Sequence, residues 1–342
     1  MKGSYLNDEF FSRLETLSLE LRADLAGFFG GKHLVRTYGQ TVEFADYREY
    51  TLGDDIRRID WNLYSRFEKT VYELIVQIIE EFSVSDFVPC GFELKIDRDG
   101  EVPPYEISLE DDGKIYIRGL VDRVDMMEKN GEKYIRVVDY KTGGKDFRLY
   151  EVLEGINMQM LIYLFAIQEN GKDNYENCIP AGVLYKPAKF GQLKMKRFAD
   201  ENDLAKERKK EGKYSGLILA QEDVIYGMDR TGNGEIIGVR VNEGKDNKVT
   251  FKGSVATLSQ LGKLKEKVDR IIAAMGNGLH SGNVEILPFE NGNDSACTFC
   301  DYKDVCLRRE EDENRATQVL KNEEIFKNLD GEGDENGRSE MD

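Results

Sequence analysis

Two segments in the first half of the chain alternate between apolar and polar residues, which is the pattern of β-strands with one buried face. They span residues 115–127 and 133–141, and Asn130-Gly131 lies between them. Asn-Gly strongly favours a two-residue turn, so the pattern predicts an antiparallel hairpin in which the numbers of paired residues sum to 261. This register places Asp122 opposite Asp139.

Other segments repeat their apolar residues at helical spacing. Residues 149–169 are predicted to form one helix, which follows the end of a strand at Gly143-Gly144. Gln159 and Tyr163 are four residues apart and would share a face of that helix. Residues 70–82 also have helical spacing.

The predicted hairpin brings two carboxylates and one ammonium group to the same face. Asp122 and Asp139 would have Cβ atoms only ~5 Å apart, and like charges in this position repel one another. A hard divalent cation between them would offset the repulsion. Lys141 lies two residues after Asp139 and so points to the same face. The alternative is an exposed charged hairpin face with a longer loop, because the register of a strand pair is easily shifted.

Six segments resemble, in their order, the motifs of one nuclease family. They are Phe87–Glu93, Gly119–Asp125, Val138–Gly143, Gln159–Tyr163, Ile179–Tyr185 and Ala296–Cys306. The chain resembles the PD-(D/E)xK nuclease superfamily in its RecB-like branch. Over residues 87–308 it resembles the C-terminal nuclease domain of the B subunit of AddAB-type helicase–nucleases, which process double-strand DNA ends.

The resemblance implies a site for Mg²⁺ or Mn²⁺. Asp122, Asp139 and the backbone carbonyl of Tyr140 would bind the cation, and waters would complete its octahedral shell. Lys141 would orient or help to deprotonate the attacking water and would neutralise charge that builds on the phosphate. The implied reaction is hydrolysis of a phosphodiester bond.

The resemblance also implies roles for residues outside the hairpin. Gln159 and Tyr163 would order the site and contact the DNA backbone. Glu93 matches an upstream acidic position, and a solvated strand residue is an equal alternative. RecB-like nucleases usually carry an early helix with a His and a Glu, which this chain lacks. His33 and His280 are interpreted as incidental polar residues. We therefore expect metal binding to be retained but cleavage at the full rate to be lost.

Five cysteines and the lack of a signal peptide predict a reducing, cytoplasmic environment. Cys297, Cys300 and Cys306 have spacing that suits metal thiolates. In the family these three hold a [4Fe–4S] cluster with a fourth, upstream cysteine, which is missing here. Cys90 and Cys178 are predicted to be small buried hydrophobes. Zinc binding and reduced thiols are alternatives to the favoured interpretation, a vestigial or partner-completed cluster.

The first part of the chain resembles a different family. Thr37–Tyr50 and Gly53–Arg66 resemble a bacterial uncharacterised family that accompanies MoxR-type ATPases and leads into a von Willebrand factor A-type fold. A helix over 7–29 and a strand over 43–50 are predicted there. The chain is interpreted as a fusion of two incomplete domains that meet near 70–82.

The distribution of charged residues distinguishes a basic run and an acidic tail. The net charge of −17 argues against broad non-specific DNA binding, which depends on Lys and Arg. A basic run over 186–213 could flank DNA, although a solvated loop is the favoured interpretation. Residues 322–342 are acidic and are predicted to be a disordered tail. No transmembrane segment is apparent.

These patterns predict an α/β fold with a restriction-endonuclease-like mixed sheet flanked by helices, preceded by a short α+β fragment. The predicted domains are a partial domain over 1–75, a nuclease-like domain over 76–310 and the acidic tail over 311–342. The predicted function is Mg²⁺-dependent exonuclease action on DNA, with the A subunit of a helicase–nuclease as partner. The alternative is a non-enzymatic interaction or DNA-binding protein with an incomplete nuclease core.

Overall fold

The computed structural model describes most of the chain after residue 60. The described residues are 61–143, 147–188, 200–244, 249–291, 294–306, 308–309, 312–315 and 319–336. The predicted helix over 7–29, the strand over 43–50 and His33 lie outside them. Among the described residues, no helix has both the length and the apolar character needed to cross a membrane.

The chain divides into two compact units. The smaller unit holds the described parts of Met1–Glu81, Thr142–Gly144 and Pro187–Gly212, and the larger unit holds those of Phe82–Lys141, Lys145–Lys186 and Lys213–Asp342. Helix α2 (Trp61–Val84) begins in the smaller unit and confirms the helical spacing over 70–82. Val71, Leu74 and Ile78 are its buried apolar residues in that unit.

Helix α5 (Glu201–Glu211) of the smaller unit corrects the prediction of a solvated loop in the basic run. Asp200 caps its start, because the Asp200 side chain accepts a hydrogen bond from the Asp203 backbone N–H at 2.8 Å. Arg208 pairs with Glu211 at 2.7 Å on the same helix and with Glu73 of α2 at 3.8 Å. Such surface ion pairs contribute little to stability, and they leave less basic charge available for DNA.

The larger unit contains the main sheet. Its elements are β1 (Val88–Ile96), β2 (Tyr105–Ser108), β3 (Lys114–Ile117), β4 (Gly119–Lys129), β5 (Glu132–Lys141), α3 (Leu149–Leu153), α4 (Gln159–Asn170), β6 (Cys178–Pro187), β7 (Ser215–Leu219), α6 (Glu222–Met228), β8 (Arg240–Glu243), β9 (Val249–Lys252), β10 (Val255–Ala256), α7 (Leu258–His280), β11 (Glu290–Asn291), β12 (Asp294–Ser295) and α8 (Asn322–Asn336).

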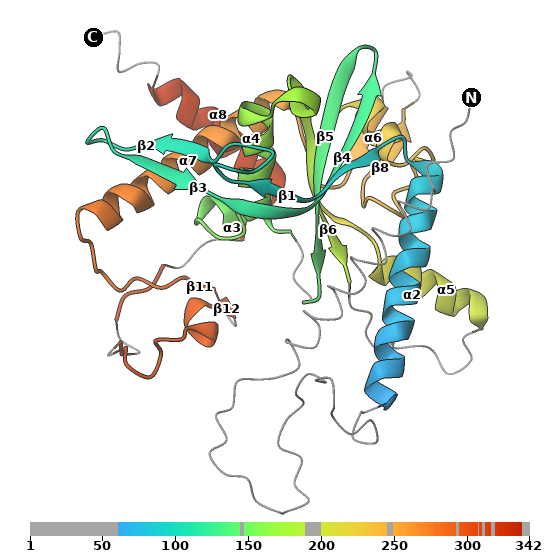
Figure 1. The fold of residues 1–342 in the computed structure, drawn as a ribbon, viewed down its shortest axis with the longest axis horizontal. Helices are drawn as coiled ribbons and strands as arrows, with labels where there is room; N and C mark the ends of the chain where they lie inside the picture. Colours follow the sequence, from blue (N-terminus) through green and yellow to red (C-terminus); the bar gives the residue numbers. More distant parts are fainter. Residues whose placement is uncertain are drawn as a thin grey trace, which may run out of the picture. The chain divides into compact units, whose positions relative to one another are not determined.

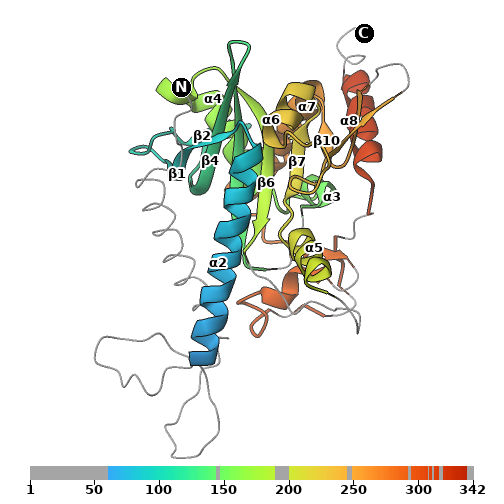
Figure 2. The same ribbon diagram turned by 90° about the vertical axis from the view of Figure 1, so that its right-hand side faces the viewer.

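Six of these strands form one sheet in the order β1-β4-β5-β6-β7-β10. Strands β1, β4, β5 and β6 of this sheet are labelled in Figure 1. The pairs β1/β4, β4/β5 and β6/β7 are antiparallel, whereas β7 and β10 are parallel. Figure 2 shows β4, β6, β7 and β10 following one another across the view. Helix α4 packs against β5 and α7, and α6 packs against β7. The mixed sheet flanked by helices confirms the predicted fold class.

The hairpin of β4 and β5 has the predicted register. Its pairs run from Arg123 opposite Val138 to Lys129 opposite Glu132. Asn130 and Gly131 have φ angles of 55° and 82°, the left-handed conformation that a type I′ turn requires. The first strand begins at Gly119 and not at residue 115, because Lys114–Ile117 forms β3 and pairs with β2.

The helix predicted over residues 149–169 is two helices. Gly155 and Asn157, between α3 and α4, have φ angles of 78° and 56°. Left-handed residues end a helix, and Gly and Asn are the residues that adopt this conformation most easily. Every residue of α4 from Met160 to Ile167 is buried, so this helix runs through the core.

Helix α8 shows that the prediction of a disordered tail was wrong for residues 322–336. Ile325, Phe326 and Leu329 lie on one face of α8 and are buried in the core, where α8 packs against α7. Three apolar residues at helical spacing are sufficient to dock a helix that is otherwise strongly acidic. Composition therefore misled the prediction, because the few apolar positions all share one face.

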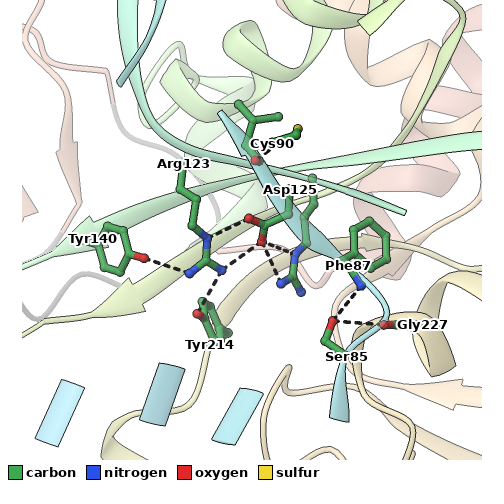
Figure 3. Close-up of polar contacts among 10 residues, drawn as sticks. Ser85, Phe87, Cys90, Arg123, Asp125, Tyr140, Tyr214 and Gly227 are labelled. Carbon is green, nitrogen blue, oxygen red and sulfur yellow. Dashed lines mark hydrogen bonds and ion pairs between the residues drawn. The ribbon is translucent and has the colours of Figure 1, made fainter. Parts of the chain in front are cut away.

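A cluster of buried charged residues lies on one face of the β4–β5 hairpin (Figure 3). Asp125 is directly opposite Arg136 and is fully buried. Its Oδ2 accepts hydrogen bonds from Arg136 Nε at 2.8 Å and from Arg123 Nη2 at 3.0 Å. The Arg136 guanidinium also lies 4.9 Å from the ring centroid of Phe87. We call Arg123, Asp125 and Arg136 the buried ion cluster.

Removing the charge of Asp125 should destabilise the fold strongly. Asp125→Asn would leave two buried guanidinium groups without their shared carboxylate, and breaking a buried ion pair in this way costs about 3–5 kcal/mol. Urea unfolding followed by circular dichroism would measure the loss. Asp99→Asn is the control, because Asp99 pairs with Lys95 on the surface, and its unfolding midpoint should stay that of the parent. Equal midpoints for both variants would contradict this account.

Candidate functional site

The face of the hairpin opposite the buried ion cluster carries the predicted acidic residues. Asp122 is the next residue of β4 beyond the Arg123–Val138 pair, which brings it level with Asp139 in β5. Its side-chain Oδ2 accepts a hydrogen bond from the backbone N–H of Tyr140 at 3.0 Å. Asp122 therefore reaches across to β5 at the residue that follows Asp139.

Lys141 and Asp139 meet as the alternation of a strand requires. Lys141 Nζ lies 2.8 Å from Asp139 Oδ2. This oxygen is buried, and among the described residues it has no partner in hydrogen-bond geometry, so its contact with Lys141 is an ion pair without an aligned hydrogen bond. A buried carboxylate oxygen in this state can accept a further electropositive ligand.

Tyr185 of β6 forms one wall beside Lys141. Lys141 Nζ lies 5.1 Å from the centroid of the Tyr185 ring, within the range of a cation–π interaction. Burial raises the pKa of Tyr185, and the nearby carboxylates of Asp139 and Glu151 raise it further. The phenol therefore stays neutral at neutral pH and offers its ring to the ammonium group without adding negative charge. The sequence prediction gave Tyr185 no role, although this residue ends one of the segments that resemble the family's motifs.

Gln159 and Tyr163 lie on one face of α4, as predicted. Gln159 Nε2 donates a hydrogen bond to the Tyr163 hydroxyl at 3.0 Å. The Tyr163 ring packs directly on Gly119, the first residue of β4, and a Cβ atom at this position would overlap the ring and its hydroxyl. Gly119 is three residues before Asp122, so α4 is held against the strand that carries this carboxylate.

Glu93 lies in β1, level with Asp122 in β4. The pairs Phe92–Arg123 and Leu94–Val121 flank this position. The three acidic residues Glu93, Asp122 and Asp139 therefore occupy neighbouring places on three adjacent strands. Glu93 is exposed and has a φ angle of 48°, which is uncommon for a residue other than Gly, Asn or Asp. Its conformation, and not only its identity, distinguishes it from an ordinary strand residue.

The cysteines occupy a separate segment after α7. Cys297 follows the small β11–β12 hairpin, and Cys300 and Cys306 lie in the turns that come next. In the described part of the chain, no three His, Cys, Asp or Glu side chains are arranged to hold a metal ion. Cys178 is buried as predicted. Cys90 is exposed as a residue, which corrects its prediction, although its thiol donates a hydrogen bond to the backbone carbonyl of Val124 at 3.4 Å.

His280 plays no part in the hairpin site. It ends α7, is exposed, and its Nδ1 lies 3.8 Å from Asp111 on the surface.

The buried ion cluster is a feature that the sequence prediction overlooked. A signal for it was present, because the register that pairs Asp122 with Asp139 also pairs Asp125 with Arg136.

Comparison with known proteins shows the family of the chain. Residues 38–307 match the PD-(D/E)XK nuclease superfamily. The chain belongs to this superfamily. It is 36% identical over 276 residues to the B subunit of the ATP-dependent helicase/deoxyribonuclease of Clostridium novyi, covering 79% of this chain and 24% of the relative. It is 33% identical over 278 residues to the protein of the same name from Clostridium acetobutylicum, with the same two shares, 79% and 24%.

A third relative of the same name, from Ruminiclostridium cellulolyticum, is 33% identical over 262 residues, which cover 76% of this chain and 22% of the relative. The chain thus spans about a quarter of the length of these curated relatives. The superfamily membership confirms the resemblance on which the hairpin site was predicted. The roles of the individual residues stay predictions.

The packing of Tyr163 on Gly119 can be tested with two glycine substitutions. Gly119→Ala should lower the free energy of unfolding by about 1–3 kcal/mol, because the added methyl group forces Tyr163 out of place. Gly262→Ala is the matched control. Gly262 is exposed on α7 with open space around it, so alanine should stabilise its helix by about 0.5–1 kcal/mol. Thermal unfolding of both variants would show whether the two shifts have opposite signs.

Proposed function

We propose that the chain is a divalent-metal-dependent DNA nuclease that hydrolyses phosphodiester bonds. The observation that carries this proposal is the convergence of Asp122, Asp139 and Lys141 on one face of the β4–β5 hairpin in a member of a nuclease superfamily. Two carboxylates with an adjacent ammonium group provide both a cation site and a positive charge beside it. These are the groups that phosphodiester hydrolysis requires.

The donor atoms of the hairpin suit Mg²⁺ or Mn²⁺. Asp122, Asp139 and the carbonyl of Tyr140 offer hard oxygen ligands, which these cations prefer. The buried Asp139 Oδ2, without a partner in hydrogen-bond geometry among the described residues, supports a role as ligand. When bound, the cation would lower the pKa of water and stabilise negative charge on the phosphate.

The protein's own residues would then orient the reactants. Lys141 would hold a water molecule for attack and neutralise charge on the phosphate oxygens. The Tyr185 ring would keep the ammonium group in place, because a cation–π contact restricts a flexible lysine. Gln159 and Tyr163 would contact the DNA backbone from α4, and the exposed Glu93 would add an acidic group level with Asp122.

The names of the relatives indicate the process and the partner that we propose for this chain. These relatives are named as the B subunit of an ATP-dependent helicase/deoxyribonuclease. We propose that this chain acts as an exonuclease on DNA ends in double-strand break repair and recombination, leaves 5′-phosphates and works with an A subunit. Free thiols on all five cysteines are compatible with the predicted cytoplasmic location.

Substitutions in the hairpin should strongly slow the cleavage of linear DNA. Asp122→Asn, Asp139→Asn and Lys141→Met each remove a group that stabilises the transition state by several kcal/mol, so the rate should fall by roughly 100-fold or more. The assay follows end-labelled linear duplex DNA with Mg²⁺ and compares it with the same reaction in EDTA. A parent that is equally active in EDTA would contradict metal dependence.

Matched controls separate a local effect from general loss of charge. Asp111→Asn and Lys114→Met remove the same kinds of charge from exposed or partly exposed positions on the β2–β3 hairpin. Both should cleave at the rate of the parent. If the parent and all variants bind DNA but none cleaves it, the chain is a DNA-binding protein with an incomplete nuclease core, and the proposed activity is wrong.

The cysteine segment supports a second, separate proposal. This segment supplies three thiol groups, those of Cys297, Cys300 and Cys306. An iron–sulfur cluster usually has four thiolate ligands, one more than this segment provides. The side chains are not gathered into a metal site among the described residues, so no step of the reaction is assigned to them. We propose that they bind an iron–sulfur cluster that a ligand from a partner completes.

Iron content and visible absorption would test this proposal. After anaerobic reconstitution, the parent should contain iron and absorb in the visible range, and Cys300→Ser should lose most of both because one of three thiolates is gone. Cys90→Ser is the control, since Cys90 is also exposed but lies in β1. Bound zinc without visible absorption would show that the cluster assignment is wrong.

A further inference from the structure

Tyr140 occupies an unusual place, because it lies between two residues of the hairpin site. Asp139 and Lys141 direct their side chains to the face of that site, so the alternation of β5 sends the Tyr140 side chain to the opposite face. There its hydroxyl accepts a hydrogen bond from Arg123 Nη1 at 2.8 Å (Figure 3). The backbone N–H of Tyr140 donates to Asp122 Oδ2 at 3.0 Å. Tyr140 is therefore tied to β4 by two hydrogen bonds.

Arg123 is rigidly held by its surroundings. Its side chain is buried, and its Nε lies 2.9 Å from Asp125 Oδ1 while its Nη2 donates to Asp125 Oδ2 at 3.0 Å. The guanidinium also lies 5.1 Å from the ring centroid of Phe82 and 5.8 Å from that of Tyr140. A buried arginine with a two-point contact to a carboxylate has few alternative rotamers, so it provides a fixed donor for the Tyr140 hydroxyl.

The bond between Arg123 and Tyr140 lies directly behind the acidic pair. Arg123 follows Asp122 in β4, and Tyr140 follows Asp139 in β5. The two residues are diagonal neighbours across the strands, a distance that long side chains can span. Movement of one strand relative to the other at this level would stretch the bond and would also change the separation of the two carboxylates.

We propose that the hydrogen bond from Arg123 to Tyr140 sets the separation of Asp122 and Asp139 and thereby the affinity of the hairpin for a divalent cation. Arg123 and the Tyr140 hydroxyl are positioning groups, because they act through the acidic pair. This inference rests on the proposed nuclease function and deepens it. Groups outside the ligand shell commonly change metal affinity by about 10–100-fold when they are removed.

Tyr140→Phe tests the proposal with the smallest change. It removes only the hydroxyl and keeps both the ring and the backbone carbonyl. Mn²⁺ alone is titrated into the full chain and followed by electron paramagnetic resonance, and the Mg²⁺ dependence of DNA cleavage is measured in parallel. We expect the Mn²⁺ dissociation constant and the half-saturating Mg²⁺ concentration to rise by about 10-fold or more.

Tyr214→Phe is the matched control. The Tyr214 hydroxyl accepts a longer hydrogen bond, 3.4 Å, from Nη2 of the same arginine, but Tyr214 does not belong to β5. Its loss should leave the Mn²⁺ dissociation constant at the parental value. Arg123→Lys is a second variant. It keeps the positive charge beside Asp125 but lacks the Nη1 group that donates to the Tyr140 hydroxyl, so it should weaken Mn²⁺ binding as Tyr140→Phe does.

The outcomes separate this inference from the function on which it rests. A parent chain that neither binds Mn²⁺ nor cleaves DNA overturns the proposed function and the inference with it. If the parent binds Mn²⁺, and Tyr140→Phe and Arg123→Lys lower only the melting temperature while the folded variants bind Mn²⁺ as the parent does, the bond is merely structural. In that case the inference is wrong and the proposed function stands.

Discussion

Two left-handed residues, Asn130 and Gly131, set the pairing of β4 with β5, and the site depends on this pairing. A shift of one residue would turn every side chain of one strand to the other face of the sheet. Asp122 would then lie among the buried residues, and Asp125 would lose its place opposite Arg136. The same turn thus fixes the acidic pair on one face and the buried ion cluster on the other.

The two faces of the hairpin therefore depend on each other. Buried charges are costly unless they are paired, so the register that satisfies Asp125 is strongly preferred over its neighbours. The repulsion between Asp122 and Asp139 works in the opposite direction, because it favours separation of the strands at that level. The buried ion cluster offsets this repulsion and keeps the two strands paired. Under the proposed function, this would hold the two carboxylates in place before a cation binds.

The parts of the fold that the sequence predicted are those governed by local rules. The Asn-Gly turn, the alternation of the two strands and the i, i+2 relation of Asp139 to Lys141 all follow from neighbouring residues. Gln159 and Tyr163 share a face for the same reason. The break at Gly155 and Asn157 was missed, because glycine and asparagine are also tolerated within helices and only tertiary packing decides between the two outcomes.

Other features could not be predicted because they depend on contacts between distant segments. The wall formed by Tyr185 requires β6 to pass beside Lys141, and no periodicity in either strand encodes this approach. The docking of α8 depends on a complementary surface on α7, so an acidic composition alone gave the wrong result. The left-handed conformation of Glu93 has no local signal either, since glutamate rarely adopts it.

The packing of α8 on α7 has a consequence for the cysteines between them. Their segment is held at both ends by these helices, so it forms a closed loop and not a free end. The entropy of bringing its two ends together is already lost when the helices dock, whether or not the thiols find a ligand. The closure of this segment, and the sheet with its acidic pair, therefore do not depend on the state of the thiols.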